Sequence, residues 1–225
     1  MTAAVLDERP ASATGTTRIL LVDDHPVVRQ GIRQILTEAL TPAQVDESDD
    51  GESALVRLAG SEYDAVILDI TLPGRSGLEI LRDIRHRWPD LPVLVLSMHP
   101  AEQFARRVLD AGAAGYLTKD SAPAQLVKAI RLVLSGRRYL SPDLIEELVV
   151  GERTTRPARP HEALSDREYQ VLRMIASGKT VSQIAAALSL SVKTVSTYRV
   201  RVLEKMGMHS TAELMRYAIE NRLVD

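Results

Sequence analysis

The chain has 225 residues, of which 45% are hydrophobic and 26% are charged, and its formal net charge is −2. This is the composition of an ordinary soluble globular chain with one large domain or two small ones. The absence of cysteine excludes disulfide scaffolds, cysteine-based zinc sites, iron–sulfur clusters and cysteine nucleophiles. An aromatic content of only 4% argues against a carbohydrate-binding surface or a base-stacking platform built on many rings.

Residues 1–17 mix Ala, Thr, Ser, Gly and Pro with charges of both signs. They lack the apolar stretch of a signal peptide, and we expect a disordered segment. No run of about 18 apolar residues occurs in the chain, so we expect no membrane span and a cytoplasmic location.

Short apolar runs alternate with amphipathic stretches over residues 18–138. The runs cover residues 19–22, 65–68, 93–96 and 114–117, and a further strand is expected over 43–47. Because most of these runs do not alternate with polar residues, they suit strands buried on both faces of a sheet. Apolar residues recur at helical spacing in the stretches 27–36, 78–84, 104–109 and 126–134. The alternation predicts an α/β fold with a doubly wound five-stranded parallel sheet.

The pattern changes after residue 138. Residues 141–150 are typical of a short helix, and residues 151–160 are rich in Pro, Gly and Arg, so we expect a linker with a short helix over 139–160. Residues 161–225 predict an all-α unit of four short helices. Its helix signals are capping boxes at Ser165, Thr180 and Ser210, an N-cap at Ser191, and Gly178 and Gly207 where helix ends need a positive φ.

Polar residues follow the apolar runs of the first unit: Asp23 and Asp24, then Asp69, Ser97 and Lys119. In a parallel sheet, ligand groups gather beyond the carboxyl ends of the strands, so these side chains should converge. Three crowded carboxylates need a cation, and oxygen ligands favour Mg²⁺. A carboxylate beside Mg²⁺ can attack a phosphoryl group, while Lys119 and the Ser97 hydroxyl share the charge on the phosphoryl oxygens.

The segments LVDDHP (21–26), LDITLPGRSG (68–77), LSMH (96–99) and GYLTKD (115–120) resemble, in this order, the receiver domain of two-component response regulators. The resemblance covers roughly residues 18–136. It implies that Asp69 is the phosphoacceptor and that Asp24, Asp69 and the backbone carbonyl of Thr71 bind Mg²⁺ directly. Asp23 would assist through water.

The same resemblance implies a conformational switch. Lys119 would bridge to the phosphoryl group, Ser97 would donate a hydrogen bond to it, and the orientation of Tyr116 would report the change. Phosphorylation adds negative charge and acceptor oxygens, so the Ser97 hydroxyl should move inward to donate a hydrogen bond. The loop that carries Ser97 would move with it and open space that the Tyr116 ring can occupy. Without the family pattern, Tyr116 would be interpreted as a half-exposed aromatic residue at a sheet edge.

Neighbouring residues have simpler interpretations. Pro73 and Gly77 are expected to shape the loop. His25 is expected to be a loop residue, and no second histidine at metal spacing supports a zinc site. His99 and Thr71 stand two positions past Ser97 and Asp69. We expect both to flank the phosphoryl group and tune attack by water, which an unchanged acyl-phosphate lifetime in a His99→Ala variant would contradict.

The helices of residues 161–225 fit a helix-turn-helix, with a turn at 189–191. Over residues 192–205, four Lys or Arg residues stand against Glu204 alone. Lys193 and Thr194 lie in the first helical turn, where backbone N–H groups and the helix dipole favour a phosphate. The structural alternative is an ordinary solvated helix face.

The segments LSDREYQVLRMIASG (164–178), IAAAL (184–188), SVKTVSTY (191–198) and LEKMG (203–207) resemble the LuxR-type DNA-binding domain. Joined to a receiver domain, they resemble the NarL/FixJ class of transcriptional regulators. The resemblance implies a core made of Glu168, Val171, Leu172, Ile184, Ala185, Leu188, Val195, Leu203 and Met206.

The LuxR-type pattern also implies the DNA contacts. Ser196, Thr197 and Val200 would face the major groove, where hydroxyls and a valine bias base choice only weakly. More of the affinity should therefore come from contacts to phosphates. The expected basic and polar contact residues are Lys179, Lys193, Thr194, Tyr198, Arg199, Arg201 and Lys205.

Together these features predict a DNA-binding transcriptional regulator controlled by phosphorylation. A sensor histidine kinase would phosphorylate Asp69, which would favour a homodimer on double-stranded DNA with a two-fold-related operator. No enzymatic activity is expected beyond self-phosphorylation and self-dephosphorylation. The alternatives are a regulator that ignores phosphorylation and a Mg²⁺-dependent phosphohydrolase, which needs a carboxylate where this chain has Thr71.

Overall fold

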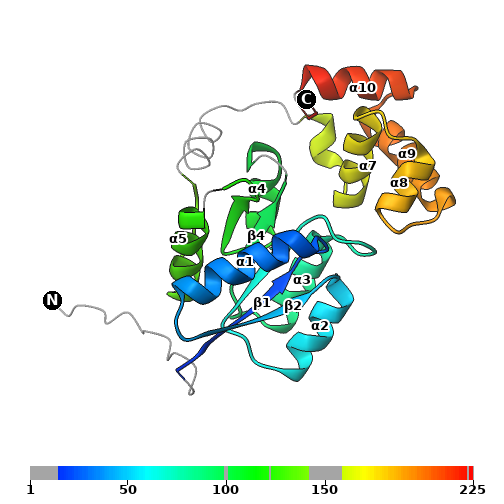
Figure 1. The fold of residues 1–225 in the computed structure, drawn as a ribbon. Coiled ribbons are helices and arrows are strands. Elements are labelled where there is room, and N and C mark those ends of the chain that lie inside the picture. Colours follow the sequence, from blue (N-terminus) through cyan, green and yellow to red (C-terminus); the bar gives the residue numbers. More distant parts are fainter. Residues whose placement is uncertain (1–14, 99–100, 122, 142–158, 222, 225) are drawn as a thin grey trace. The chain divides into compact units, whose positions relative to one another are not determined.

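The computed structural model describes residues 15–98, 101–121, 123–141, 159–221, 223 and 224 (Figure 1). The chain divides into two compact units, residues 1–149 and 150–225. The predicted linker helix and His99 lie outside the described residues, as does the predicted disordered segment up to residue 14. Within the described part of the chain, no helix is long and apolar enough to cross a membrane.

The first unit contains a five-stranded sheet in the order β2-β1-β3-β4-β5, and every neighbouring pair is parallel. The predicted α/β class and number of strands are therefore confirmed. The strand order reverses at β1, which has β2 on one side and β3 on the other, and in such sheets ligands bind outside the carboxyl ends of the strands at this point. The strands are β1 (Thr17–Val22), β2 (Ala43–Ser48), β3 (Ala65–Asp69), β4 (Val93–Ser97) and β5 (Gly115–Thr118).

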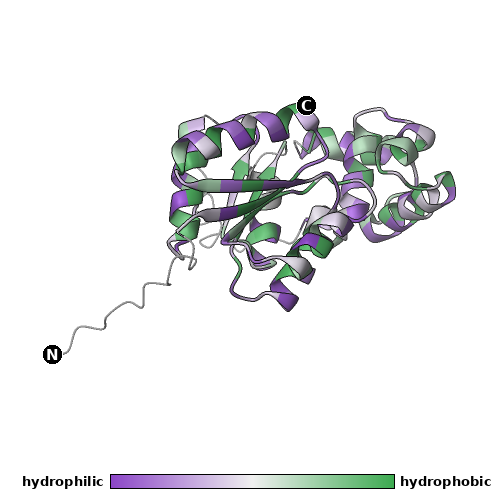
Figure 2. Cartoon of the chain, turned by 60° about the horizontal axis from the view of Figure 1, so that its bottom comes forward, coloured by the Kyte–Doolittle hydropathy of each residue, from purple (hydrophilic) through white to green (hydrophobic). Residues whose placement is uncertain are grey.

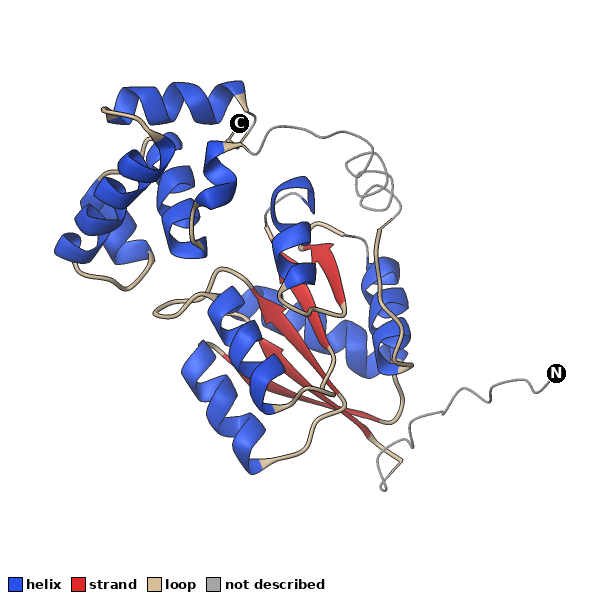
Figure 3. Cartoon of the chain, turned by 180° about the vertical axis from the view of Figure 1, so that it is seen from behind, coloured by secondary structure: helices blue, strands red, loops and turns tan. Residues whose placement is uncertain are grey.

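Helices cover both faces of the sheet. Helices α1 (Pro26–Ala39) and α5 (Pro123–Leu134) pack beside each other on the face toward the viewer in Figure 1. Helices α2 (Gly51–Gly60), α3 (Gly77–Arg87) and α4 (Ala101–Asp110) cover the other face, which Figure 3 shows. Most helices carry both hydrophobic and hydrophilic residues (Figure 2), as amphipathic segments between core and solvent do.

Helix α2 is not among the amphipathic stretches identified from the sequence. Its N-cap Asp50 accepts a hydrogen bond from the Ser53 N–H, and its buried residues Ala54, Leu55 and Leu58 recur at helical spacing. The apolar pattern that predicts this helix is present in the sequence but short.

One core cluster of the first unit lies between the sheet and helices α1 and α5, and the buried residues of α2 and α3 pack on the opposite face. Strands β3 and β4 are buried along their whole lengths, as predicted from their unbroken apolar runs. This packing fixes the strand ends, and with them the residues that follow. The cluster beneath α1 and α5 consists of Ile19, Leu21, Ile32, Leu36, Ala65, Ile67, Leu94, Leu96, Leu117, Leu126, Ala129, Ile130, Val133 and Tyr139.

The second unit is helical. A 3₁₀ turn, η1 (Pro160–Ala163), precedes α7 (Asp166–Ala176), α8 (Val181–Ala187), α9 (Val192–Met206) and α10 (Thr211–Glu220). Four α-helices were predicted, and four are found among the described residues of this unit. The buried cluster around α8 and α9 consists of Val171, Ile175, Ile184, Ala185, Leu188 and Val195.

The predicted helix ends are largely confirmed. The capping boxes at Ser165 and Thr180 form, and Ser191 caps α9. The box predicted at Ser210 is only half formed, because the Glu213 carboxylate accepts from the N–H of His209 rather than from that of Ser210. Both predicted glycines have positive φ. Of the predicted core residues, Leu203 is only partly buried, and the others are buried.

Candidate functional site

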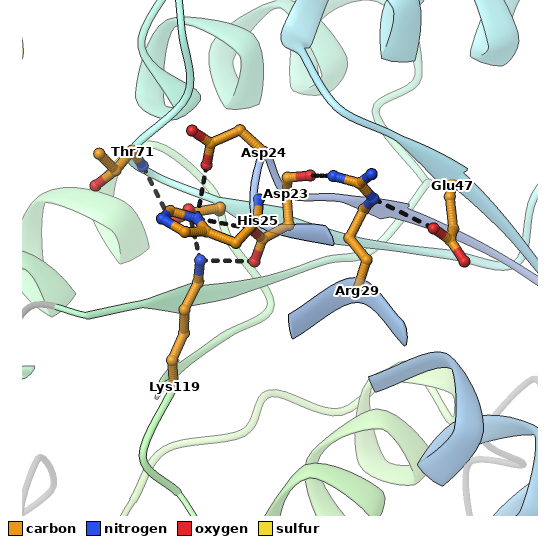
Figure 4. A network of polar contacts seen from close by, with 8 residues as sticks. Asp23, Asp24, His25, Arg29, Glu47, Thr71 and Lys119 are labelled. Carbon is orange, nitrogen blue, oxygen red and sulfur yellow. Dashed lines mark hydrogen bonds and ion pairs between the residues drawn. The ribbon is translucent and has the colours of Figure 1, made fainter. Parts of the chain in front are cut away.

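Three charged side chains meet at the carboxyl ends of β1, β3 and β5 (Figure 4). The Nζ atom of Lys119 lies 2.7 Å from Oδ2 of Asp69 and 2.6 Å from Oδ2 of Asp23. All three side chains are almost fully buried, with exposed fractions of 3% for Lys119 and 1% for each aspartate. The parallel sheet therefore brings together the residues that the sequence placed at successive strand ends.

The environment shifts the ionisation of this group. Burial raises the pKa of Asp69 to about 6, although the charge and hydrogen bond of Lys119 and the N–H of Thr71 act in the opposite direction. Burial alone would lower the pKa of Lys119, but Asp69 and Asp23 outweigh it, and the pKa is raised. At neutral pH the pocket thus holds an ammonium group and an ionised Asp69, which is the form that acts as a nucleophile.

Asp24 and His25 complete an acidic pocket. One potential ligand atom from each of Asp23, Asp24, His25 and Asp69 lies within 4.8 Å of the others. The His25 Nδ1 atom is 2.8 Å from Oδ1 of Asp24 and 3.1 Å from Oδ1 of Asp23. Oδ2 of Asp23 and Oδ1 of Asp24 are buried and, apart from these ion-pair contacts, accept no hydrogen bond from the described residues. Carboxylate oxygens in this state fit a hard divalent cation such as Mg²⁺.

The position of the His25 ring was missed by sequence reasoning. His25 does precede α1 as its N-cap residue, in agreement with the loop assignment. Its backbone N–H donates to Oδ1 of Asp23 at 2.8 Å, which turns the chain so that the ring lies beside the carboxylates. The sequence did contain a signal for this position, because His25 directly follows Asp23 and Asp24.

The remaining predicted residues of the first unit surround Asp69. The Thr71 N–H donates to Oδ1 of Asp69 at 3.0 Å. Ser97 is fully buried at the end of β4, and its carbonyl accepts from the Lys119 N–H at 2.8 Å. Tyr116 is only 1% exposed, so the half-exposed position considered from the sequence is wrong. Although β5 is an edge strand, α4 packs on it, which leaves the ring enclosed.

Gly77 shapes the loop beneath the pocket, as predicted. A Cβ atom at this position would lie 2.1 Å from the backbone oxygen of Asp69 and 2.6 Å from Cα of Ile70. The Gly77 N–H donates to the Ile70 carbonyl at 2.9 Å. Only glycine allows α3 to begin so close to the end of β3.

Helix α9 of the second unit carries the second candidate site. Lys193, Thr194, Thr197, Tyr198 and Arg201 line one depression on the surface of the unit. Lys193, Thr197 and Arg201 are exposed, and the other two are half-buried. A concave surface with two cations and several hydroxyl-bearing side chains suits phosphate oxygens.

The other predicted DNA contacts are distributed around the same helix and the turn before α8. Val200 is 47% exposed, Ser196 is half-buried and Lys179 is exposed. The Thr194 N–H donates to Oγ of Ser191 at 3.0 Å. The cap therefore uses this one backbone N–H of the first turn.

Two of the predicted basic contacts are engaged within the protein. Nη1 of Arg199 donates to Oγ1 of Thr211 at 3.4 Å. Nζ of Lys205 lies 2.6 Å from Oε2 of Glu168, whose side chain is only 4% exposed. Burial would raise the pKa of Glu168, but hydrogen bonds from Lys205 and Ser165 hold it below its usual value. This ion pair explains how a carboxylate occupies a core position.

Two protein families match the chain, one over each unit, and individual relatives match nearly its whole length. The response regulator receiver domain matches residues 19–131, and the bacterial regulatory proteins of the luxR family match residues 162–218. The response regulator UvrY of Escherichia coli K12 is 38% identical over 206 residues, which are 91% of this chain and 94% of UvrY. The response regulator GacA of Pseudomonas protegens is 38% identical over 208 residues, with 92% and 98% coverage of the two chains.

A solved structure is similar over both units. It is RcsB from Salmonella enterica serovar Typhimurium bound to the promoter rprA in the presence of the phosphomimetic BeF₃⁻. It matches with a TM-score of 0.63 and 29% sequence identity, covering 90% of this chain and 98% of RcsB. The chain therefore belongs to the NarL/FixJ class of two-component response regulators, transcription regulators in which a receiver domain controls a LuxR-type DNA-binding domain through phosphorylation.

Proposed function

We propose that Asp69 accepts a phosphoryl group from a sensor histidine kinase. The observation that carries the proposal is the buried contact of Lys119 with both Asp69 and Asp23. In the transfer, an oxygen of the Asp69 carboxylate attacks the phosphorus of a phosphohistidine. The P–N bond breaks, the imidazole leaves with the electron pair and takes up a proton, and Asp69 becomes an acyl phosphate.

The same pocket is proposed to hold Mg²⁺ through Asp24, Asp69 and the Thr71 carbonyl, with Asp23 beside them. The bound ion would neutralise charge on the phosphoryl oxygens. The buried oxygens of Asp23 and Asp24, which accept no hydrogen bond among the described residues beyond their ion-pair contacts, support this assignment. Lys119 would supply the second positive charge, since its ammonium already lies 2.7 Å from the attacking carboxylate.

The response to phosphorylation is proposed to run through Ser97 and Tyr116. Both are buried, and Ser97 ends the strand next to β3, which carries Asp69. A new phosphoryl oxygen would accept the Ser97 hydroxyl, and the loop after β4 would follow. The space vacated by this movement would let the Tyr116 ring change its orientation.

DNA binding is proposed for the outer surface of α9. Lys193, Thr194, Tyr198 and Arg201 would contact phosphates, and Ser196, Thr197 and Val200 would lie in the major groove. Lys179, Arg199 and Lys205, which do not line the depression on α9, are proposed as further phosphate contacts. RcsB bound to a promoter supports this arrangement. A homodimer on a two-fold-related operator, in the cytoplasm where the DNA lies, completes the proposal.

Acetyl phosphate or phosphoramidate with Mg²⁺ tests the phosphorylation step. The wild type should form one stable acyl phosphate per chain, and Asp69→Asn should form none. Multiple turnovers would indicate a phosphohydrolase instead. A DNA affinity that is equal with and without the donor would indicate a regulator that ignores phosphorylation.

A further inference from the structure

A guanidinium group on α1 contacts the backbone of the acidic pocket. Nη1 of Arg29 donates to the carbonyl oxygen of Asp23 at 2.5 Å, and Nε donates to Oε2 of Glu47 at 3.2 Å (Figure 4). The Arg29 side chain is only 15% exposed. A single, largely buried side chain thus connects α1, the end of β1 and strand β2.

Glu47 has a second partner one helical turn further along α1. Nε of Arg33 lies 3.1 Å from Oε1 of Glu47, and the Arg33 side chain is 52% exposed. The two oxygens of Glu47 therefore hold two guanidinium groups. Among the described residues, the side-chain contacts of Arg33 end at Glu47, whereas the Arg29 side chain also contacts Asp23.

These contacts leave Asp23 little freedom. Its N–H donates to the Ser48 carbonyl at 3.1 Å, its carbonyl accepts from Arg29, and its Oδ1 accepts from the His25 N–H at 2.8 Å. Its Oδ2 faces Lys119. A ligand residue whose peptide groups are fixed in advance loses less conformational entropy when the ligand binds.

We infer that Arg29 is a positioning residue of the phosphorylation site. It fixes the Asp23 carbonyl, and so places the carboxylates of Asp23 and Asp24 for a divalent cation, while Glu47 orients the guanidinium group. This inference rests on the proposed function of the pocket. The contact between Arg29 and Glu47 does not follow from the sequence pattern, since Glu47 lies on β2, 18 residues away from Arg29 on α1.

The shape of the guanidinium group is essential to this role. Its planar fork donates in two directions at once, toward Glu47 from Nε and toward Asp23 from Nη1. A lysine at this position keeps the positive charge but offers one point contact. Arg29→Lys therefore separates positioning from simple charge neutralisation.

The test compares Arg29→Met, Arg29→Lys and the matched control Arg33→Met in the full chain. Arg33→Met removes a guanidinium group from the same helix and from the same Glu47, but not from Asp23. Mg²⁺ affinity is measured by calorimetry without a phosphodonor, below the unfolding temperature of each variant. Both Arg29 variants should bind Mg²⁺ about tenfold more weakly, and Arg33→Met should stay within about twofold of the wild type.

A second measurement separates the affinity for Mg²⁺ from the rate of phosphoryl transfer to Asp69. The initial rate of phosphorylation by phosphoramidate, followed against Mg²⁺ concentration, should show a higher half-saturation for Arg29→Lys and nearly the wild-type maximal rate. Equal Mg²⁺ affinity in the wild type and both Arg29 variants would overturn the inference, as would an equal loss in Arg33→Met. If the wild type itself bound no Mg²⁺, the proposed metal site would fail first and the inference with it. Should Arg29→Met not fold, Arg29→Lys still decides the question.

Discussion

The ammonium group of Lys119 lies 2.7 Å from Oδ2 of Asp69 and 2.6 Å from Oδ2 of Asp23, so one buried cation holds two buried carboxylates. The carboxylates come from the ends of neighbouring strands, and the cation comes from the residue after β5. Removing Lys119 would leave two buried carboxylates without a counter-ion, whereas removing one carboxylate leaves the ammonium group paired with the other. The ionisation of this group is therefore coupled to the stability of the sheet.

Asp69→Asn should stabilise the metal-free protein at about pH 8 but not at about pH 4. The folded pKa of Asp69, about 6, lies above its ordinary value of 3.8. Folding therefore favours the protonated Asp69 carboxyl. The stability that this gives the folded protein is present at low pH and is lost as the pH rises through about 6. Removing the carboxylate should recover on the order of 3 kcal/mol at the higher pH.

Urea unfolding in the presence of a chelator, at both pH values, measures this difference. A free-energy change that is the same at both pH values would contradict the assigned direction of the pKa shift.

Mg²⁺ should raise the Tm of the wild type and should have little effect on Asp24→Asn. A ligand that binds only the folded state adds about 2.7 kcal/mol when it is present at about a hundredfold excess over its Kd. Asp49→Asn removes the same charge from an exposed neighbouring position and should retain the full shift. Thermal unfolding with and without Mg²⁺ measures the effect, and an equal shift in the two variants would place the cation elsewhere.

Gly77→Ala should destabilise the first unit by about 3 kcal/mol or more, because its Cβ would lie 2.1 Å from the Asp69 carbonyl oxygen. Gly31→Ala is the contrasting case. Gly31 lies within α1, and a Cβ atom there would have no atom within 4 Å beyond the neighbouring backbone of its own helix. This change should therefore stabilise the helix by about 0.5–1 kcal/mol. Chemical denaturation of both variants decides, and similar behaviour of the two would contradict the packing described.

Lys205→Met should lower the stability of the second unit, because it leaves the buried Glu168 carboxylate without its ion pair. It should weaken DNA binding less than Lys193→Met, whose ammonium group lines the surface depression of α9. Lys193→Met should also reduce the salt slope of DNA binding by about one. Thermal unfolding and DNA titrations over a range of salt concentrations measure both effects. A larger loss of DNA affinity in Lys205→Met than in Lys193→Met would contradict the view that Lys205 acts mainly through its ion pair with Glu168.

Patterns that are local in the chain were readable from the sequence. The buried strands stand out as apolar runs, and the capping residues Ser165, Thr180 and Ser191 stand directly before the helices they begin. Convergence of Asp23, Asp69 and Lys119 followed from a general rule about parallel sheets, which needs no knowledge of side-chain packing.

Contacts between distant segments were not readable. The bond between Arg29 and Glu47 depends on how α1 lies over β2, and the ion pair between Lys205 and Glu168 joins residues 37 positions apart. Both arginine and lysine have long side chains that reach several partners, so composition alone does not select one. Such choices are made by tertiary packing.

The most direct test is the affinity of the full chain for its operator DNA, measured for the wild type and Asp69→Asn with and without phosphoramidate and Mg²⁺. Genome-wide mapping of bound DNA would supply the operator. Phosphorylation should tighten binding by the wild type about tenfold or more and leave Asp69→Asn unchanged, which corresponds to a coupling of at least about 1.4 kcal/mol. An equal response of both proteins to the phosphodonor, or no response in a wild type shown to carry the acyl phosphate, would contradict control of DNA binding through Asp69.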